Sequence, residues 1–230
     1  MELLPNGFAL DIAPGAFPLS TDSMLLADFA RLPKGARVLD LGSGCGTLGL
    51  LLCARDPGCT VSGIELDEGA HFCALENIRR NGLDGRMESI CSDLRGFPAG
   101  LLPGSFSCCV SNPPYFSGGP ASEAHPLARR EDCCSPGDLF CAAAKALKYG
   151  GDFFLVHRPE RLAELIASAS RFQLEAKRLR LVRHKAGGPV ALILLSFRKG
   201  GKPGLILEEE TLFDAAGTPT DFYRRVYHLT

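Results

Sequence analysis

The chain has 230 residues, of which 46% are hydrophobic and 22% charged, a composition typical of one globular α/β domain. Its formal net charge of −1 excludes a uniformly basic protein, although 13 Lys and Arg stand against 4 acidic residues between Lys145 and Lys202. The sequence contains neither a basic leader nor an apolar run of the roughly 18 residues that a membrane helix needs. We therefore expect a cytoplasmic protein with no membrane partner.

The ten cysteines and five histidines show no metal-ligand spacing, and no Cys-x-x-Cys pair occurs. Most of the cysteines lie inside apolar segments, where a free thiol packs as a small hydrophobic group. We expect reduced thiols, no disulfide framework and no metal site.

Strands and helices alternate along the chain, after a first helix over Thr21–Arg31 that Ser20 or Thr21 caps. The other expected elements are the strand Val38–Leu41, the helix Thr47–Ala54, the strand Thr60–Glu65, the helix Asp67–Asn81, the strands Met87–Ser92 and Phe106–Ser111, the helix Ser135–Lys148, the strand Asp152–Val156, the helix Pro159–Arg171, the strands Leu174–Arg183 and Val190–Arg198, and a helical patch at Thr220–Tyr227. This alternation predicts a parallel sheet that helices cover on both faces. The turn Gly187-Gly188 indicates that the last two strands pair antiparallel.

The first candidate binding site is a glycine-rich turn that follows Asp40 at a strand end and contains Gly42, Gly44 and Gly46. Glycines at such a position let a ligand approach the backbone closely. Dinucleotide enzymes use a similar turn, and a tight strand-to-helix turn gives the same pattern without a ligand. The G-x-G-x-G spacing with Asp40 favours an S-adenosylmethionine pocket.

Acidic residues close the next two strands. Glu65 ends the second strand and can accept hydrogen bonds from both ribose hydroxyls of a cofactor, although an acid here also suits the start of the next helix. Asp93 follows the third strand and can accept from the adenine amino group of the cofactor. It can equally cap a helix, and the two roles can coexist. With the glycine-rich turn upstream, we expect both residues to bind the cofactor.

The most specific motif is Asn112-Pro113-Pro114-Tyr115, at the end of the fourth strand. The prolines fix the backbone and remove two N–H donors, which leaves the Asn112 side-chain oxygen and the Pro113 carbonyl as acceptors. Two acceptors match the two donors of a planar NH₂ group and free its lone pair for attack on a sulfonium methyl. Tyr115 offers a face on which a flat substrate stacks. A Pro-Pro turn with a buried Tyr is the alternative to a catalytic role for Asn112, Pro113 and Tyr115.

Together these motifs resemble those of class I methyltransferases that modify amino nitrogens, and the stretch Asn77–Leu83 is also typical of them. Within that group the chain is similar to the tRNA1(Val) (adenine-N6)-methyltransferase family, which modifies the adenosine next to the anticodon. The stretches that carry this narrower resemblance are Phe17–Ala27, Ala128–Glu131, Lys177–Val182 and Leu205–Tyr227.

The resemblance implies one S-adenosylmethionine-dependent domain over residues 1–230 with a Rossmann-like α/β fold. The implied sheet is seven-stranded and mostly parallel, with an antiparallel last strand and helices on both faces. Residues 1–35 would form a helical cover over the cofactor, with Thr21 in contact with it, and residues 205–230 a C-terminal tail. A plain packing helix explains Thr21–Leu26 equally well. The substrate adenine would be flipped out beside the cofactor.

The basic C-terminal half favours RNA as the partner, although a set of solvated faces explains the same charges. The cations that we expect to follow a tRNA phosphate backbone are Lys177, Arg178, Arg180, Arg183 and Lys185. The expected function is therefore methylation of adenine N6 in a tRNA anticodon loop.

Two other substrates fit the same motif. Glutamine N5-methyltransferases also act on a planar NH₂, but they normally carry a sizeable helical domain before the glycine-rich turn, and only 37 residues precede Val38 here. Ribosomal guanine-N2 methyltransferases share a similar motif. Asn112 and Tyr115 disfavour a dehydrogenase or a non-catalytic nucleotide-binding module, because neither needs a clamp for an amino nitrogen.

Overall fold

The computed structural model describes residues 2–5, 7–16, 19–113 and 134–229. The expectations for Tyr115 and for Ala128–Glu131 therefore lie outside the described residues. A small antiparallel pair, β1 (Glu2–Leu3) and β2 (Ala9–Leu10), precedes the main sheet.

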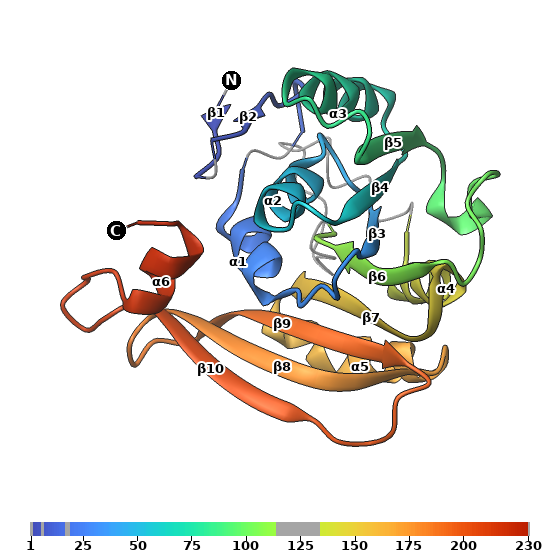
Figure 1. The fold of residues 1–230 in the computed structure, drawn as a ribbon. Coiled ribbons are helices and arrows are strands. Elements are labelled where there is room, and N and C mark those ends of the chain that lie inside the picture. Colours follow the sequence, from blue (N-terminus) through green and yellow to red (C-terminus); the bar gives the residue numbers. More distant parts are fainter. Residues whose placement is uncertain (1, 6, 17–18, 114–133, 230) are drawn as a thin grey trace.

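The main sheet has eight strands in the order β10-β8-β9-β7-β6-β3-β4-β5 (Figure 1). Their bounds are β3 Arg37–Leu41, β4 Thr60–Glu65, β5 Met87–Cys91, β6 Phe106–Ser111, β7 Leu147–His157, β8 Leu174–Lys185, β9 Val190–Lys199 and β10 Ile206–Phe213. Strands β3 to β7 run parallel, β9 runs antiparallel to both β7 and β8, and β10 runs parallel to β8. The carboxyl ends of β3 to β8 and of β10 therefore share one edge of the sheet.

The α/β fold class with an antiparallel strand in a parallel sheet is confirmed, but the expected count of seven strands is wrong. The eighth strand is β10, which lies in the segment expected as a tail and pairs with β8 from Ile206 opposite Arg178 to Phe213 opposite Lys185. β10 is an edge strand and keeps one side in solvent, so it can contain the acidic run Glu208–Glu210. The sequence of this run is not typical of a strand.

Helices cover both faces of the sheet. They are α1 (Thr21–Phe29), α2 (Thr47–Arg55), α3 (Glu68–Arg80), α4 (Pro136–Ala146), α5 (Leu162–Ser170) and α6 (Asp221–Val226), with the short 3₁₀ helices η1 (Leu94–Gly96) and η3 (Pro159–Arg161). Val38 belongs to the core under α1, α2, α3 and α6, whereas its neighbour Leu39 belongs to the core under α4 and α5. This alternation follows from the two-residue period of a strand, so both faces of β3 are apolar. Within the described part of the chain, no helix is both long and apolar enough to cross a membrane.

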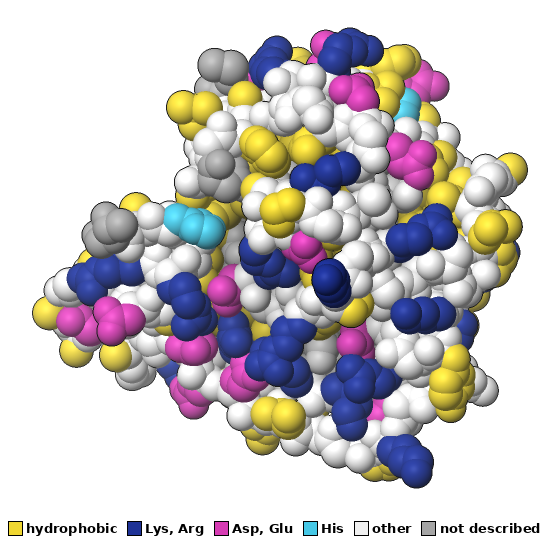
Figure 2. Space-filling view, in the orientation of Figure 1, with side chains coloured by type: hydrophobic (Ala, Val, Ile, Leu, Met, Phe, Trp, Pro, Cys, Tyr) yellow, Lys and Arg dark blue, Asp and Glu magenta, His cyan; other side chains and the backbone are white. Residues whose placement is uncertain are grey.

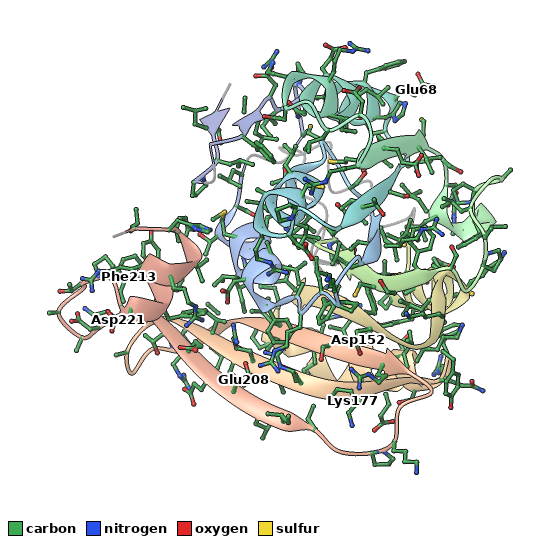
Figure 3. All side chains as sticks on the ribbon, in the orientation of Figure 1. Glu68, Asp152, Lys177, Glu208, Phe213 and Asp221 are labelled. Atoms are coloured by element: carbon green, nitrogen blue, oxygen red, sulfur yellow. The ribbon has the colours of Figure 1, made fainter. Side chains whose placement is uncertain are left out.

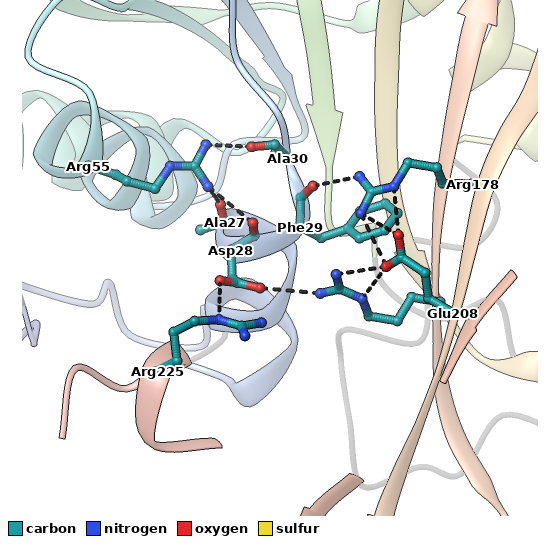
Figure 4. Close-up of polar contacts among 9 residues, drawn as sticks. Ala27, Asp28, Phe29, Ala30, Arg55, Arg178, Glu208 and Arg225 are labelled. Carbon is teal, nitrogen blue, oxygen red and sulfur yellow. Dashed lines mark hydrogen bonds and ion pairs between the residues drawn. The ribbon is translucent and has the colours of Figure 1, made fainter. Parts of the chain in front are cut away.

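Helix α1 is anchored to the C-terminal elements by an ion-pair network (Figure 4). Asp28 pairs with Arg180 at 3.2 Å and with Arg225 at 3.5 Å. Arg178 donates to the Phe29 carbonyl at the end of α1, at 3.2 Å. These contacts hold the C-terminal end of α1 against β8 and α6. The positive charges also stabilise this end of the helix through its dipole.

Candidate functional site

A cavity of about 350 Å³ lies at the carboxyl ends of β3, β4 and β6. Strand β3 has β4 on one side and β6 on the other, so the strand order reverses here. Ligands of open α/β sheets bind at such a point. The expected site residues that line the cavity are Asp40, Gly42, Gly44, Glu65, Asp93, Asn112 and Pro113.

The glycine-rich turn forms one wall of the cavity. The backbone N–H groups of Gly42 and Ser43 donate to the Ile64 carbonyl at 2.9 and 3.0 Å, which fixes the turn to the end of β4. Gly44 has a φ of 55°, a conformation that favours glycine. Gly46 does not line the cavity, and a Cβ there would come within 2.8 Å of Met87 Cε. Gly46 therefore serves the packing of α2, and Gly42 and Gly44 form the wall.

The Glu65 carboxylate connects the end of β4 to the glycine-rich turn. Its Oε2 accepts from the Gly44 N–H and its Oε1 accepts from the Asp67 N–H, both at 2.8 Å. The residue is 8% exposed and faces the cavity. Since each carboxylate oxygen accepts two hydrogen bonds, both retain capacity for ligand hydroxyls.

Asp40 is a buried carboxyl that lines the cavity. It is 1% exposed, and neither of its oxygens has a hydrogen-bond partner among the described residues. Burial, and secondarily the charge of Glu65, raises its pKa to about 8. An unpaired buried carboxylate is costly, so the cavity favours a ligand that brings a positive charge. S-adenosylmethionine, with its ammonium and sulfonium groups, fits this requirement.

Asp93 has two structural roles beside the cavity. Its side chain accepts from the Arg95 N–H at 2.9 Å as the cap of η1, and hydrogen bonds from Arg95 hold the pKa of its carboxyl below the usual value. It also lines the cavity. Asp93 therefore caps η1 and lines the cavity at the same time.

Asn112 and Pro113 follow β6 and line the cavity, while Tyr115 lies outside the described residues. The Asn112 Nδ2 donates to the Ser23 hydroxyl at 3.0 Å. Ser23 is in the first turn of α1 and its N–H donates to the hydroxyl of Ser20, the residue that caps this helix. Both serines line the cavity, and the sequence motifs do not point to either of them as a site residue.

Thr21 was expected to contact the cofactor, but it is not among the lining residues. Its hydroxyl lies 2.8 Å from the hydroxyl of Tyr227, beyond α6. Successive residues of a helix point about 100° apart, so Ser20 and Ser23 lie near the cavity while Thr21 contacts the C-terminal segment. Helix α1 therefore reaches the cavity through Ser23 and its capping residue Ser20, and not through Thr21.

The basic segment of β8 does not present one continuous charged face. Arg178 and Arg180 are 7% and 8% exposed, and both pair with Glu208 of β10, at 2.9 and 2.7 Å. The expectation that these two follow an RNA backbone is therefore corrected, because burial and pairing keep them from it. Figure 2 shows Lys and Arg interspersed with Asp and Glu on this side of the molecule.

The other three expected cations are divided between the two ends of β8: Lys177 lies near one end, and Arg183 and Lys185 lie at the other. Lys177 donates to the Lys202 carbonyl at 2.8 Å, near the amino end of β8. Lys185 is exposed and pairs in register with Phe213, at the carboxyl end. Figure 3 shows Lys177 and Phe213 at opposite ends of these strands. Arg183, which pairs with Glu209, and Lys185 share the edge that holds the cavity.

Residues 19–170 match the family model described as the methyltransferase small domain. A tRNA1(Val) (adenine(37)-N6)-methyltransferase of Bacteroides thetaiotaomicron is 32% identical over 197 residues, covering 84% of this chain and 81% of the relative. The protein of the same name from Dickeya chrysanthemi is 33% identical over 190 residues, covering 81% and 75%.

Solved structures share the fold at lower identity. A predicted O-methyltransferase from Agrobacterium tumefaciens has a TM-score of 0.75 at 22% identity, covering 90% of this chain and 96% of the other. A geranyl diphosphate methyltransferase in complex with S-adenosylmethionine has a TM-score of 0.58 at 14% identity, covering 77% and 84%. These likenesses support the fold and carry no information on the substrate.

Proposed function

Because the chain belongs to the family of tRNA1(Val) (adenine(37)-N6)-methyltransferases, we propose that it methylates N6 of an adenine in a tRNA anticodon loop. The observation that carries the proposal is that Asn112 and Pro113 line the same cavity as Asp40, Gly44 and Glu65. Acceptors for an amino group thus lie beside the cofactor-binding residues. A cytoplasmic location is part of the proposal.

The cofactor is S-adenosylmethionine, which supplies an electrophilic methyl group when bound. We assign Glu65 to its ribose hydroxyls, Asp93 to its adenine amino group and Asp40 to its cationic end. Gly42 and Gly44 let it approach the backbone. The unpaired oxygens of Asp40 and the spare acceptor capacity of Glu65 support these assignments.

Asn112 and Pro113 act on the substrate. Their two oxygens accept the two N–H bonds of the exocyclic amino group, which draws its nitrogen lone pair out of conjugation with the ring. Tyr115 is assigned from the sequence to stack on the adenine. The neutral amino group needs no side-chain base, because its proton is lost to water once the nitrogen has become cationic. Catalysis then rests on orientation, which can contribute roughly 7–11 kcal/mol.

We place the tRNA backbone along the carboxyl edge of the sheet, beside Arg158, Arg183 and Lys185. Arg158 follows β7 and is exposed, as is Lys185 at the end of β8. Both are on the edge at which Asn112 follows β6. Lys177 is distant from this edge, so it is not part of the proposed path.

The test of the proposed function is nucleoside mass spectrometry after incubation of the purified protein with S-adenosylmethionine and unmodified tRNA. N6-methyladenosine is the expected product. Two parallel reactions replace the tRNA, one by a ribosomal RNA fragment and the other by a release factor. N2-methylguanosine or N5-methylglutamine, with no N6-methyladenosine, would replace the proposal by one of its two alternatives.

A further inference from the structure

A hydrogen bond between helix α1 and the motif after β6 joins residues 89 positions apart. The Asn112 Nδ2 lies 3.0 Å from the Ser23 Oγ. Ser23 is 6% exposed, so water does not freely replace this contact. Both residues line the cavity, which places the contact at the site itself.

The Ser23 hydroxyl has a second partner, the Ser20 Oγ at 3.4 Å, and the Ser23 N–H also donates to that oxygen. A serine hydroxyl has one proton and two acceptor positions. When Ser23 donates its proton to Ser20, it offers Asn112 only acceptor positions. An amide next to such an oxygen turns its NH₂ toward it, and its carbonyl oxygen is left for another donor.

We propose that Ser23 is a positioning residue for methyl transfer, because it fixes the Asn112 amide with its oxygen available to the substrate amino group. This inference rests on the proposed function, since it gives Asn112 the role of acceptor. Without Ser23 the amide can rotate, and its NH₂ group would then oppose the NH₂ group of the substrate. The reacting nitrogen would be held in the productive orientation for a smaller part of the time.

The test compares Ser23→Ala with Ser168→Ala, which removes the hydroxyl of a residue that is 8% exposed on the opposite face of the sheet. Single-turnover methylation of tRNA is measured at saturating cofactor and RNA, together with the Kd of each. For Ser23→Ala we expect the rate to fall roughly five- to tenfold, the equivalent of one hydrogen bond, with both Kd values unchanged. Ser168→Ala should match the wild type in all three quantities.

An unchanged rate for Ser23→Ala would overturn the inference, as would a rate loss with an equal loss of cofactor affinity, since that indicates a displaced helix. The double variant Ser23→Ala/Asn112→Ala adds a coupling test. If Ser23 acts through Asn112, the double variant is no slower than Asn112→Ala alone. Independent, additive losses would contradict the positioning role. Full activity of Asn112→Ala would instead refute the proposed function, so the two failures are distinguishable.

Discussion

Gly63 of β4 lies directly beneath Ser43 of the glycine-rich turn, and a Cβ on Gly63 would come within 2.6 Å of the Ser43 Oγ and 2.8 Å of its Cβ. The close approach of strand and turn therefore requires glycine in the strand as well as in the turn. A side chain at residue 63 must displace the wall of the cavity.

Gly63→Ala should accordingly weaken S-adenosylmethionine binding by roughly fivefold or more, because overpacking costs about 1–3 kcal/mol. Gly85→Ala is the matched control, since a Cβ there meets no atom within 4 Å. Isothermal calorimetry gives both affinities. Equal binding by the two variants would mean that the turn moves without consequence for the ligand.

We expect the Asp40 carboxyl to release a proton when the cofactor binds. Its pKa is about 8 in the free protein, above the ordinary 3.8, so the carboxyl is mostly protonated at pH 7. A raised folded-state pKa stabilises the free protein below about pH 4, and this contribution is lost as the pH rises toward 8. A bound cation favours the ionised form, so binding expels the proton and its affinity rises from pH 6 toward pH 8.

The measurement is calorimetry at pH 7 in buffers of different ionisation enthalpy. The wild type should show a buffer-dependent heat of binding, and Asp40→Asn should show a smaller dependence. The same buffer dependence in both proteins would remove Asp40 from the cationic end of the ligand.

Adjacent acids on β10 should differ in their effect on stability. Glu208 pairs with Arg178 and Arg180, whose side chains are 8% and 9% exposed, whereas Glu209 pairs with Arg183 at the surface. Loss of one partner of a buried pair leaves an uncompensated charge, so Glu208→Gln should cost about 2 kcal/mol or more of unfolding free energy. Glu209→Gln should cost less than about 1 kcal/mol. Urea denaturation compares them, and similar losses would contradict the structural role of Glu208.

The ends of β8 should contribute unequally to RNA binding. Lys185→Ala removes a cation at the edge that holds the cavity. The slope of log K for tRNA binding against log salt concentration should then become shallower by about one, the value for one lost phosphate contact. Lys177→Ala, at the other end of the strand, should leave the slope unchanged. Binding titrations from low to moderate salt measure both. If Lys177→Ala has the larger effect, the RNA follows a different surface.

The central strands β3, β4 and β6 could be predicted from the sequence because they are buried over nearly their whole length and end at or directly before Gly42, Glu65 and Asn112. Strand β10 could not, since an edge strand needs little apolar surface and Glu208–Glu210 resembles a solvated tail. The pairing of Arg178 and Arg180 with Glu208 could not be predicted either, because Glu208 is about 30 positions away in the sequence. The sequence pattern of alternating cations in a strand is the same whether the cations are solvated or paired.

The cavity residues divide in a similar way. Asp40, Glu65 and Asn112 stand at strand ends, where topology alone brings them to one edge. Ser23 required knowledge of how α1 packs, because in the sequence it is one polar residue beside Met24 and Leu25. Ser23 carries no distinct signal of its own, since Thr21 and Asp22 before it are also polar residues of the first turn.

The central claim, that Asn112 holds a substrate amino group beside the cofactor, is tested most directly by Asn112→Ala. The measurement is single-turnover formation of N6-methyladenosine in tRNA, with the cofactor Kd determined on the same preparation. Since Asn112 acts on the reacting group, the rate should fall about 100-fold or more while the Kd changes little. Wild-type rates of N6-methyladenosine formation by Asn112→Ala would contradict the account.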